Sequence, residues 1–356
     1  TLFPYTTLFR SLIAILWLAP LAFAQNYSAQ QVTEQGVPVV HLVDRAAGVT
    51  VSVAPTLGNR AYEMLVHGQN ILYFPGLASP QAAGLNAVPF LAPWANRLDE
   101  QGFWANGKHY AFDMALGNVR GATPLHGLLT AAKGWRVTDA SADAQSAHVT
   151  SRFEFWRYPD LMAQWPFAHE YEMTYRLSGG TLEVAISVTN LSTEPMPVGV
   201  GWHPYFNIAS GDRKQAKLKI PAKTRALVDN YDNVFPTGVT EPTEGSKFDF
   251  RAARPMGEQF LDDCFMDLIR EADGIVAAEI HDPAAHYAVK VTSVSPAVQA
   301  YQCYAPPEKP FIVLEPQFNI GDPFNKKVWK DRNTGMVMLA PNHEVVYDAT
   351  VEISKI

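Results

Sequence analysis

Alternation of apolar and polar residues with a period of two dominates the chain. Thr181 to Val188 reads TLEVAISV, and similar runs occupy residues 48–54, 171–177, 287–294 and 344–353. Because successive side chains of a β-strand point to opposite faces of its sheet, this pattern predicts half-buried strands. Clusters of Gly, Pro, Asn and Asp separate the runs and predict turns. The chain is therefore expected to be all-β, a large antiparallel β-sandwich.

Helical periodicity is nearly absent, and the best candidates are short pieces near Met256 to Asp262. The polar stretch from Thr237 to Lys247 is interpreted as a long surface loop, because alternating runs resume on both sides of it. The sequence contains no low-complexity linker and no repeat of fixed period. With 356 residues, of which 47% are hydrophobic, the chain can bury a large core. We predict a single domain over residues 25–356.

The N-terminal residues have the pattern of an export signal. Arg10 precedes the apolar run LIAILWLAPLAFA, which ends at Ala24 in a small-x-small cleavage pattern. The run is too short to span a bilayer comfortably. We therefore expect residues 1–24 to be a removed signal peptide, the protein to be periplasmic or secreted, and no membrane contact after removal. Since the chain does not begin with Met, one hypothesis is that residues 1–11 are not native sequence.

Charge and cysteine usage narrow the classes of partner. The net charge is −7 and the pI is near 5.8. Because binding of nucleic-acid phosphates needs a basic surface, no nucleic-acid partner is expected. Aromatic residues make up 12% of the chain, which suits a carbohydrate site and suits a packed β core equally well. The only cysteines are Cys264 and Cys303, and no Cys/His cluster predicts zinc. We expect two buried free thiols, although the sequence does not decide whether the two cysteines form a disulfide.

Five short stretches combine ionisable residues with Gly, Pro and aromatics. They are PWANRLD at 93–99, PLHG at 124–127, GWHPYFN at 201–207, LDDCF at 261–265 and VLEPQFN at 313–319. Each has a structural explanation when taken alone: an ion pair, a turn, a core histidine or, for the aspartates, a cap after a short helix. The carboxylate in the last stretch is harder to explain in this way, because it follows the apolar run FIVL. A carboxylate at the end of a buried strand needs an ion-pair or hydrogen-bond partner, unless it has a functional role.

Taken together and in this order, the five stretches resemble motifs of the aldose 1-epimerase (galactose mutarotase) family. The resemblance runs from about residue 36 to 356 and rests on NRL, LHG with KGW, HPYFN, DDCF and LEPQ. It implies a large β-sandwich, in agreement with the alternation. The chain departs from the family pattern at Leu128, where a second Gly is usual, and at Pro316, where a Thr is usual. These departures bear on substrate preference more than on chemistry.

The resemblance implies an enzyme that interconverts the α and β anomers of a free aldohexose by acid–base ring opening and closure. It implies that Glu315 is the base and His203 the acid. Since the acid must carry its proton at the start of a turnover, we expect a carboxylate beside His203 to help it keep that proton. The implied substrate-binding residues are Asn96, Arg97, His126 and Asp262, with Asp263 as an alternative to Asp262; weaker candidates to line the site are Trp135, Trp165, Tyr205 and Gln317. No metal or organic cofactor is needed, because proton transfer is sufficient. The expected partner is a monosaccharide, bound by a monomer or a homodimer.

Three other functions remain open on the sequence. A hexose-6-phosphate 1-epimerase would need more basic residues at its phosphate site, and an exported protein would rarely meet that substrate. A glycoside hydrolase would use two carboxylates, which Asp262 and Glu315 could supply. A non-catalytic sugar-binding protein would bind sugar without accelerating anomer exchange. Release of a monosaccharide from a disaccharide identifies the hydrolase, and the rate of anomer exchange separates the enzyme from the binding protein.

Overall fold

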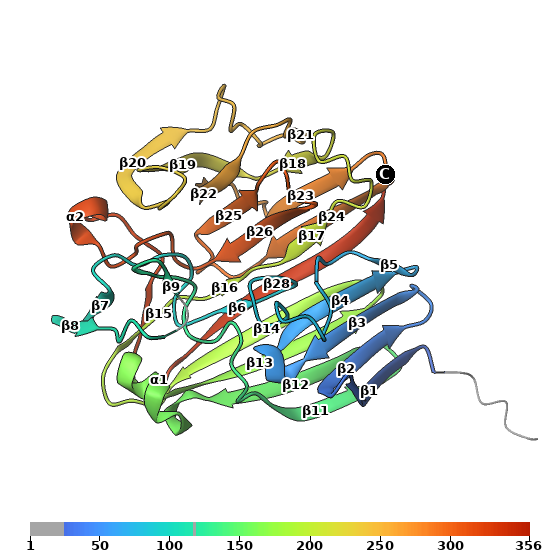
Figure 1. The fold of residues 1–356 in the computed structure, drawn as a ribbon, viewed down its shortest axis with the longest axis horizontal. Helices are drawn as coiled ribbons and strands as arrows, with labels where there is room; N and C mark the ends of the chain where they lie inside the picture. The colour runs from blue at the N-terminus through green and yellow to red at the C-terminus, as the bar shows by residue number, and fades with distance from the viewer. Residues whose placement is uncertain (1–24, 117–118) are drawn as a thin grey trace, which may run out of the picture.

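A computed structural model describes residues 25–116 and 119–356, so the signal peptide predicted for residues 1–24 lies outside the described residues. Three large sheets dominate the fold, and all neighbouring strands within them are antiparallel (Figure 1). The five-stranded sheet contains, in spatial order, β1 (Tyr27–Glu34), β2 (Val37–Asp44), β3 (Val49–Ala54), β4 (Arg60–Val66) and β5 (Gln69–Asn70). The expected all-β fold class is confirmed.

The other two large sheets carry most of the chain. The nine-stranded sheet has the order β11 (Arg136–Ala142), β12 (Ala147–Glu154), β13 (His169–Ser178), β14 (Thr181–Asn190), β28 (Glu344–Lys355), β24 (Tyr287–Ser293), β23 (Val276–Asp282), β18 (Lys217–Lys219) and β21 (Arg254–Pro255). The eight-stranded sheet has the order β20 (Pro236–Pro242), β19 (Ala222–Val228), β22 (Leu261–Leu268), β25 (Ala300–Ala305), β26 (Phe311–Gln317), β16 (Gly201–Trp202) and β6 (Phe90–Leu91), with β17 (Tyr205–Asn207) also paired to β26.

Short elements complete the described chain. The two-stranded pairs are β7 (Gly102–Ala105) with β8 (Lys108–Ala111), β9 (Val119–Arg120) with β10 (Thr123–Pro124), and β15 (Met196–Val198) with β27 (Val337–Leu339). The helices are α1 (Pro159–Gln164) and α2 (Lys326–Trp329), and 3₁₀ turns occur at Pro55–Leu57 and Phe155–Arg157. No helix within residues 25–116 and 119–356 is both long enough and apolar enough to cross a membrane.

The core lies between the layers. In Figure 1 the blue five-stranded sheet lies in front of the green strands, and β2 contacts β12 and β13. The eight-stranded sheet meets the other part of the nine-stranded sheet where β26 contacts β24. Strand β13 is buried at every second residue, as its alternating sequence predicts. Trp94 stacks on Trp165 at 5.6 Å between ring centroids, and both are fully buried.

Two local predictions were wrong. No helix forms near Met256 to Asp262, where β22 begins at Leu261 instead. The stretch from Thr237 to Lys247 is only partly loop, because β20 continues to Pro242. Within the described residues, strand β20 lies at the sheet edge and pairs only with β19, and most of its side chains face solvent. A strand exposed in this way has no apolar alternation to reveal it in the sequence.

Candidate active site

The site forms around β26, a central strand of the eight-stranded sheet. Glu315 lies on β26, and the neighbouring chain pairs with that strand on either side of His203: Gly201 pairs with Gln317, and Tyr205 pairs with Val313. Pro204 has no N–H to donate, so the ladder is interrupted at this point. The interruption leaves His203 opposite Glu315 on the partner strand.

His203 and Glu315 form a buried pair. The distance from His203 Nε2 to Glu315 Oε1 is 3.0 Å, and the two residues are 3% and 1% exposed. Glu315 Oε2 and His203 Nδ1 are buried and have no hydrogen-bond partner within the described residues. Tyr205 stacks on the His203 ring at 4.7 Å between centroids. A carboxylate oxygen left unpaired in such a place is available to a ligand hydroxyl.

Burial pushes both members of the pair toward their neutral forms. Desolvation raises the pKa of Glu315 well above its ordinary value of 4.5, and the nearby Asp262 charge raises it further. Desolvation also lowers the pKa of His203 from 6.5 to about 3, with Arg60 and Arg97 contributing. The expectation that a carboxylate would keep His203 protonated is therefore corrected. The carboxylate is present, but the cost of burying the imidazolium charge is the larger effect.

Two loops meet above the pair, each at a residue with left-handed backbone. Asn96 has φ of 64° and His126 has φ of 62°, and the amide of His126 donates to the carbonyl of Asn96 at 2.9 Å. Gly127 has φ of 72°, and a Cβ there would lie 2.1 Å from the carbonyl oxygen of Ala92. Only glycine allows the two loops to approach this closely. The Gly of the LHG motif thus places His126 over the site.

Backbone hydrogen bonding fixes the tautomer of His126. The amide N–H of Asn96 donates to His126 Nδ1 at 3.1 Å, so the neutral ring carries its proton on Nε2. Burial lowers the pKa of His126 well below 6.5, and His203 and Arg97 lower it further, so the ring is neutral. The rings of His126 and His203 meet edge to face at 5.0 Å. His126 is thus a fixed hydrogen-bond donor beside the buried pair.

Four polar side chains close a ring of hydrogen bonds at the opposite wall. Arg97 donates to Asp262 Oδ2 at 3.2 Å, and Gln302 Nε2 donates to Asp262 Oδ1 at 2.6 Å. Asn96 Nδ2 donates to Gln302 Oε1 at 3.1 Å, while Asn96 Oδ1 accepts from the Arg97 guanidinium at 3.3 Å. Each of the four side chains is buried and bonded to two others. The ring holds Arg97 and Asp262 in fixed orientations.

Strand alternation separates Asp262 from Asp263. In the register of the sheet, Cys264 pairs with Gln302 and Gln302 pairs with Glu315, so Asp262 shares the face of these residues. Asp263 lies on the other face, with its carboxylate 2.6 Å from Arg225. The same alternation places Cys264 and Cys303 on opposite faces. Both are free and buried, as predicted.

These residues surround a polar cavity of about 170 Å³. Its lining is Leu85, Asn96, Arg97, Arg120, Leu125, His126, His203, Tyr205, Asp262, Gln302, Tyr304 and Glu315. Six residues proposed from the sequence line this cavity: Asn96, Arg97, His126, His203, Asp262 and Glu315. Tyr205, a weaker candidate, also lines it. No motif contained Gln302, Tyr304 or Arg120, and only strand register places Gln302 and Tyr304 beside the motif residues.

Three of the weaker candidates do not line this cavity. Trp135 packs in the core against Phe90 and Phe153. Trp165 lies in the aromatic core described above. Gln317 is fully buried two residues beyond Glu315, with Nε2 4.0 Å from Cys264 Sγ. A large aromatic residue in a β-sandwich is more often a core residue than a site residue, and both tryptophans follow that rule.

His126, His203 and Glu315 have ligand atoms within 4.8 Å of one another, which raises the question of a metal. The hydrogen bonding of His126 argues against one. Its Nδ1 accepts from the Asn96 amide, and its Nε2 carries the proton, so neither nitrogen offers a free lone pair. The donor set therefore fits proton transfer better than metal binding.

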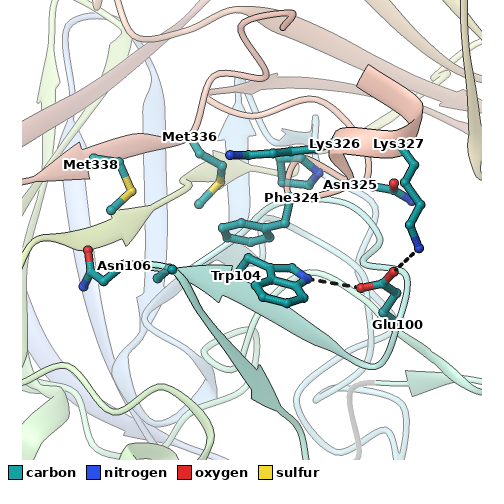
Figure 2. Close-up of a pocket in the computed structure, with 12 residues that line it drawn as sticks. Glu100, Trp104, Asn106, Phe324, Asn325, Lys326, Lys327, Met336 and Met338 are labelled. Carbon is teal, nitrogen blue, oxygen red and sulfur yellow. Dashed lines mark hydrogen bonds and ion pairs between the residues drawn. The ribbon is translucent and has the colours of Figure 1, made fainter. Parts of the chain in front are cut away.

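A second cavity, of about 560 Å³, has quite different walls (Figure 2). It lies between the β7–β8 hairpin and the segment leading into α2, and Trp104, Phe324, Met336 and Met338 make much of its surface. Trp104 Nε1 donates to Glu100 at 3.2 Å, and Lys327 donates to the same carboxylate at 3.4 Å. None of the site residues predicted from the sequence lines this cavity.

Comparison with known proteins gives a consistent result. A model of the family described as aldose 1-epimerase matches residues 42–347. Galactose mutarotase of Rattus norvegicus is 27% identical over 217 residues, which cover 58% of this chain and 59% of that protein, less than two thirds of its length. The uncharacterized protein YphB of Escherichia coli is 26% identical over 254 residues, covering 70% of this chain and 74% of that protein.

Solved structures agree on the fold. A galactose mutarotase-like protein from Clostridium acetobutylicum superposes with a TM-score of 0.80 at 21% identity, covering 94% of this chain and all of that one. Galactose 1-epimerase from Lactobacillus acidophilus superposes with a TM-score of 0.73 at 17% identity, covering 92% of this chain and 99% of that one. At these identities the likeness shows the fold alone.

Proposed function

Since the chain belongs to the aldose 1-epimerase family, we propose that it catalyses the interconversion of the α and β anomers of a free aldohexose. The observation that carries the proposal is the buried pair of His203 and Glu315 at the closed end of a polar cavity. Mutarotation requires one group that takes a proton and one that gives a proton, both within reach of the same sugar ring. A cavity of this size and polarity suits one monosaccharide.

The proposed reaction moves two protons in each direction, while the C1–O5 bond breaks or forms. Glu315 takes the proton of the C1 hydroxyl, the C1=O1 bond forms, the C1–O5 bond breaks, and O5 takes the proton of His203. Rotation about the C1–C2 bond then presents the other face of the aldehyde to O5. As O5 attacks C1, it returns its proton to His203, and Glu315 returns its proton to O1. The pair ends in the state in which it began, so no cofactor is consumed.

The pair must hold one proton between its members for this cycle to work. In the ligand-free protein, burial favours the neutral arrangement, with the proton on Glu315. The reactive arrangement has the proton on His203. A sugar hydroxyl that donates to the unpaired Oε2 of Glu315 stabilises the carboxylate and shifts the proton to His203. Substrate binding itself therefore prepares the base and the acid.

The remaining polar residues are proposed to hold the sugar. His126 donates from Nε2, Arg97 donates from its guanidinium, and Asp262 accepts from sugar hydroxyls. Asn96 and Gln302 fix the orientation of Arg97 and Asp262 through the hydrogen-bonded ring. Fixed partners matter because catalysis depends on holding C1 and O5 between base and acid.

Polarimetry tests the proposal directly. Crystalline α-D-glucose or α-D-galactose is dissolved, the protein is added, and the decay of optical rotation is compared with buffer alone. We expect the protein to accelerate the decay and Glu315→Gln and His203→Asn to abolish the acceleration. A folded protein that leaves the decay unchanged with every aldose contradicts the proposal. Release of monosaccharide from a disaccharide would instead identify a glycoside hydrolase.

We also propose export to the periplasm, on the signal-like composition of residues 1–24. Cell fractionation of the native host tests this proposal. Recovery of the protein from the periplasmic fraction supports it. Recovery only from the cytoplasm contradicts export, and recovery only from the culture medium contradicts the periplasmic location.

A further inference from the structure

One cation at the polar cavity has no partner. Arg97 is paired with Asp262 at 3.2 Å, the His203–Glu315 pair is neutral overall, and His126 is uncharged. Arg120 also lines the cavity, and within the described residues its side chain forms no ion pair and no hydrogen bond. The charged groups that line the cavity therefore leave one positive charge uncompensated.

Arg120 lies at the open end of the cavity. It ends β9 and is exposed, whereas Glu315 and His203 at the other end are buried. Tyr304 also lines the cavity, and it pairs with Asp262 across the sheet. Glu308 does not line the cavity, and it forms no ion pair with Arg120 in the described chain.

A neutral aldose does not require this cation for binding. Its hydroxyls are served by the hydrogen-bonded ring and by His126, and it carries no charge to offset the guanidinium. When C1 and O5 face Glu315 and His203, the exocyclic carbon on C5 projects from the side of the sugar ring, and an anionic group on it lies outside the ring atoms that the buried pair contacts. The planar fork of a single Arg matches a carboxylate, with two parallel hydrogen bonds and one charge on each side. A phosphate dianion would leave charge unmatched.

We propose that the preferred substrates of this site are hexuronates, aldoses that carry a carboxylate on the exocyclic carbon, and that Arg120 binds that carboxylate. The inference rests on the proposed anomer exchange and specifies its substrate class. The reaction at C1 is unchanged, because the carboxylate takes no part in proton transfer. Arg120 acts on specificity, so its loss affects the charged sugar and spares the neutral one.

The experiment compares three sugars and four proteins by polarimetry. The sugars are α-D-galacturonate, α-D-galactose and D-glucose 6-phosphate, and the proteins are the unchanged chain, Arg120→Gln, Arg120→Lys and Arg136→Gln. Arg136 is a matched control, because it is an exposed arginine on β11 whose loss changes the net charge equally. We expect galacturonate to have the highest kcat/KM. Arg120→Gln should lower that value on the order of 10-fold, with galactose unchanged within about twofold.

The conservative variant refines the expected result. Arg120→Lys keeps the charge and loses the fork, so its kcat/KM for galacturonate should lie between those of the unchanged chain and Arg120→Gln. Arg136→Gln should match the unchanged chain for all three sugars. The kcat for galacturonate should change less than KM in the Arg120 variants, because the residue binds a group remote from C1.

Each of the other outcomes contradicts a different part of the proposal. Acceleration of galactose without preference for galacturonate contradicts the substrate class and leaves the proposed anomer exchange intact. Preference for glucose 6-phosphate contradicts the carboxylate in favour of phosphate. Preference for galacturonate that survives Arg120→Gln contradicts the role of Arg120. No acceleration of any sugar contradicts the proposed function itself, and the inference with it.

Discussion

The two cavities described above differ both in size and in the chemistry of their walls. The apolar cavity beside Trp104 has about 560 Å³, while the polar cavity at Glu315 has about 170 Å³. The larger one has aromatic and thioether walls and an exposed Trp104 at 48%. The smaller one contains a buried carboxylate, two buried histidines and a closed ring of hydrogen bonds. Volume alone would select the wrong cavity, because acid–base chemistry depends on titratable groups held in place.

The difference has a structural origin. The polar cavity is built on neighbouring strands of one sheet, where strand register fixes Asp262, Gln302 and Glu315 relative to one another. The apolar cavity is built from the β7–β8 hairpin and the segment around α2 (Figure 2). Residues held by a sheet interior keep their geometry better than residues on short surface elements. The comparison predicts large effects of substitution in the first cavity and small ones in the second.

The largest effect is expected for Glu315→Gln. The amide cannot take a proton from the C1 hydroxyl, so kcat/KM for anomer exchange should fall by about 10²–10⁴-fold, the usual contribution of general acid–base catalysis. Circular dichroism spectra should remain those of the unchanged protein, because Gln fills the same volume. Polarimetry with galactose or galacturonate measures the loss. Retention of more than a tenth of the activity would place the base elsewhere.

A smaller loss is expected for Gln302→Leu, which opens the hydrogen-bonded ring. Asn96 Nδ2 and Asp262 Oδ1 each lose their hydrogen-bond partner in the ring, at a cost of about 1–3 kcal/mol for each buried polar group. Because Asp262 and Arg97 then lose their fixed orientation, we expect kcat/KM to fall on the order of 10-fold, with KM raised more than kcat is lowered. Gln299→Leu is the control, because Gln299 is partly exposed and its side chain donates to the Pro296 carbonyl outside the cavity. Equal effects of the two variants would contradict a positioning role for Gln302.

The pH dependence of stability should reveal the raised pKa of Glu315. Because the folded protein holds a proton that the unfolded chain releases above pH 4.5, the stability this group contributes is full below that pH and is lost as pH rises through the folded-state pKa. Glu315→Gln has no proton to release at this position, so it does not lose stability in this way as pH rises. The Tm of the variant relative to the unchanged protein should therefore be higher at pH 8 than at pH 4.5.

Differential scanning calorimetry of both proteins at the two pH values provides the test. His203 contributes the opposite dependence: its pKa is lowered to about 3, so its stability contribution is lost as pH falls below 6.5. That contribution is present in both proteins and largely cancels in the difference. A Tm difference that is constant with pH, or larger at pH 4.5, would show that the carboxyl is not perturbed.

The smallest effect is expected in the apolar cavity. Trp104→Ser removes its most exposed aromatic wall, and Met338→Thr changes a side chain that is 50% exposed. Neither side chain touches the polar cavity, so kcat/KM for anomer exchange should stay within about twofold of the unchanged value, and stability within about 0.5 kcal/mol for the Met338 variant. A larger loss of activity would reveal coupling between the cavities through the segment that carries Phe324.

Much of the site could be predicted from short motifs, and the rest depended on contacts between distant strands. Glu315, His203, Arg97 and His126 lie in recognisable stretches and meet in one cavity. Gln302 lies in no motif, and it reaches the cavity only because β25 is paired between β22 and β26. Such register is set by packing of whole sheets and has no local signal.

The choice between neighbouring residues shows the same limit. Alternation predicts that Asp262 and Asp263 face opposite sides of β22, but the sequence does not say which side holds the cavity. The edge strand β20 was missed because it is largely exposed and polar. The helix expected near Met256 does not form, because the chain from Leu261 onward is paired in the sheet as β22. Tertiary pairing overrode a weak local propensity in each case.

The opposite orientations of Cys264 and Cys303 have a consequence for biosynthesis. Each thiol is buried on its own face of the sheet, and burial raises the pKa of Cys264 from 9 to about 12 and raises the pKa of Cys303 well above its ordinary value. Neither is available as a thiolate for exchange. The pair of cysteines therefore requires neither an oxidant nor a disulfide isomerase, and these thiols should be in the same state in a reducing cell interior as in an oxidising compartment.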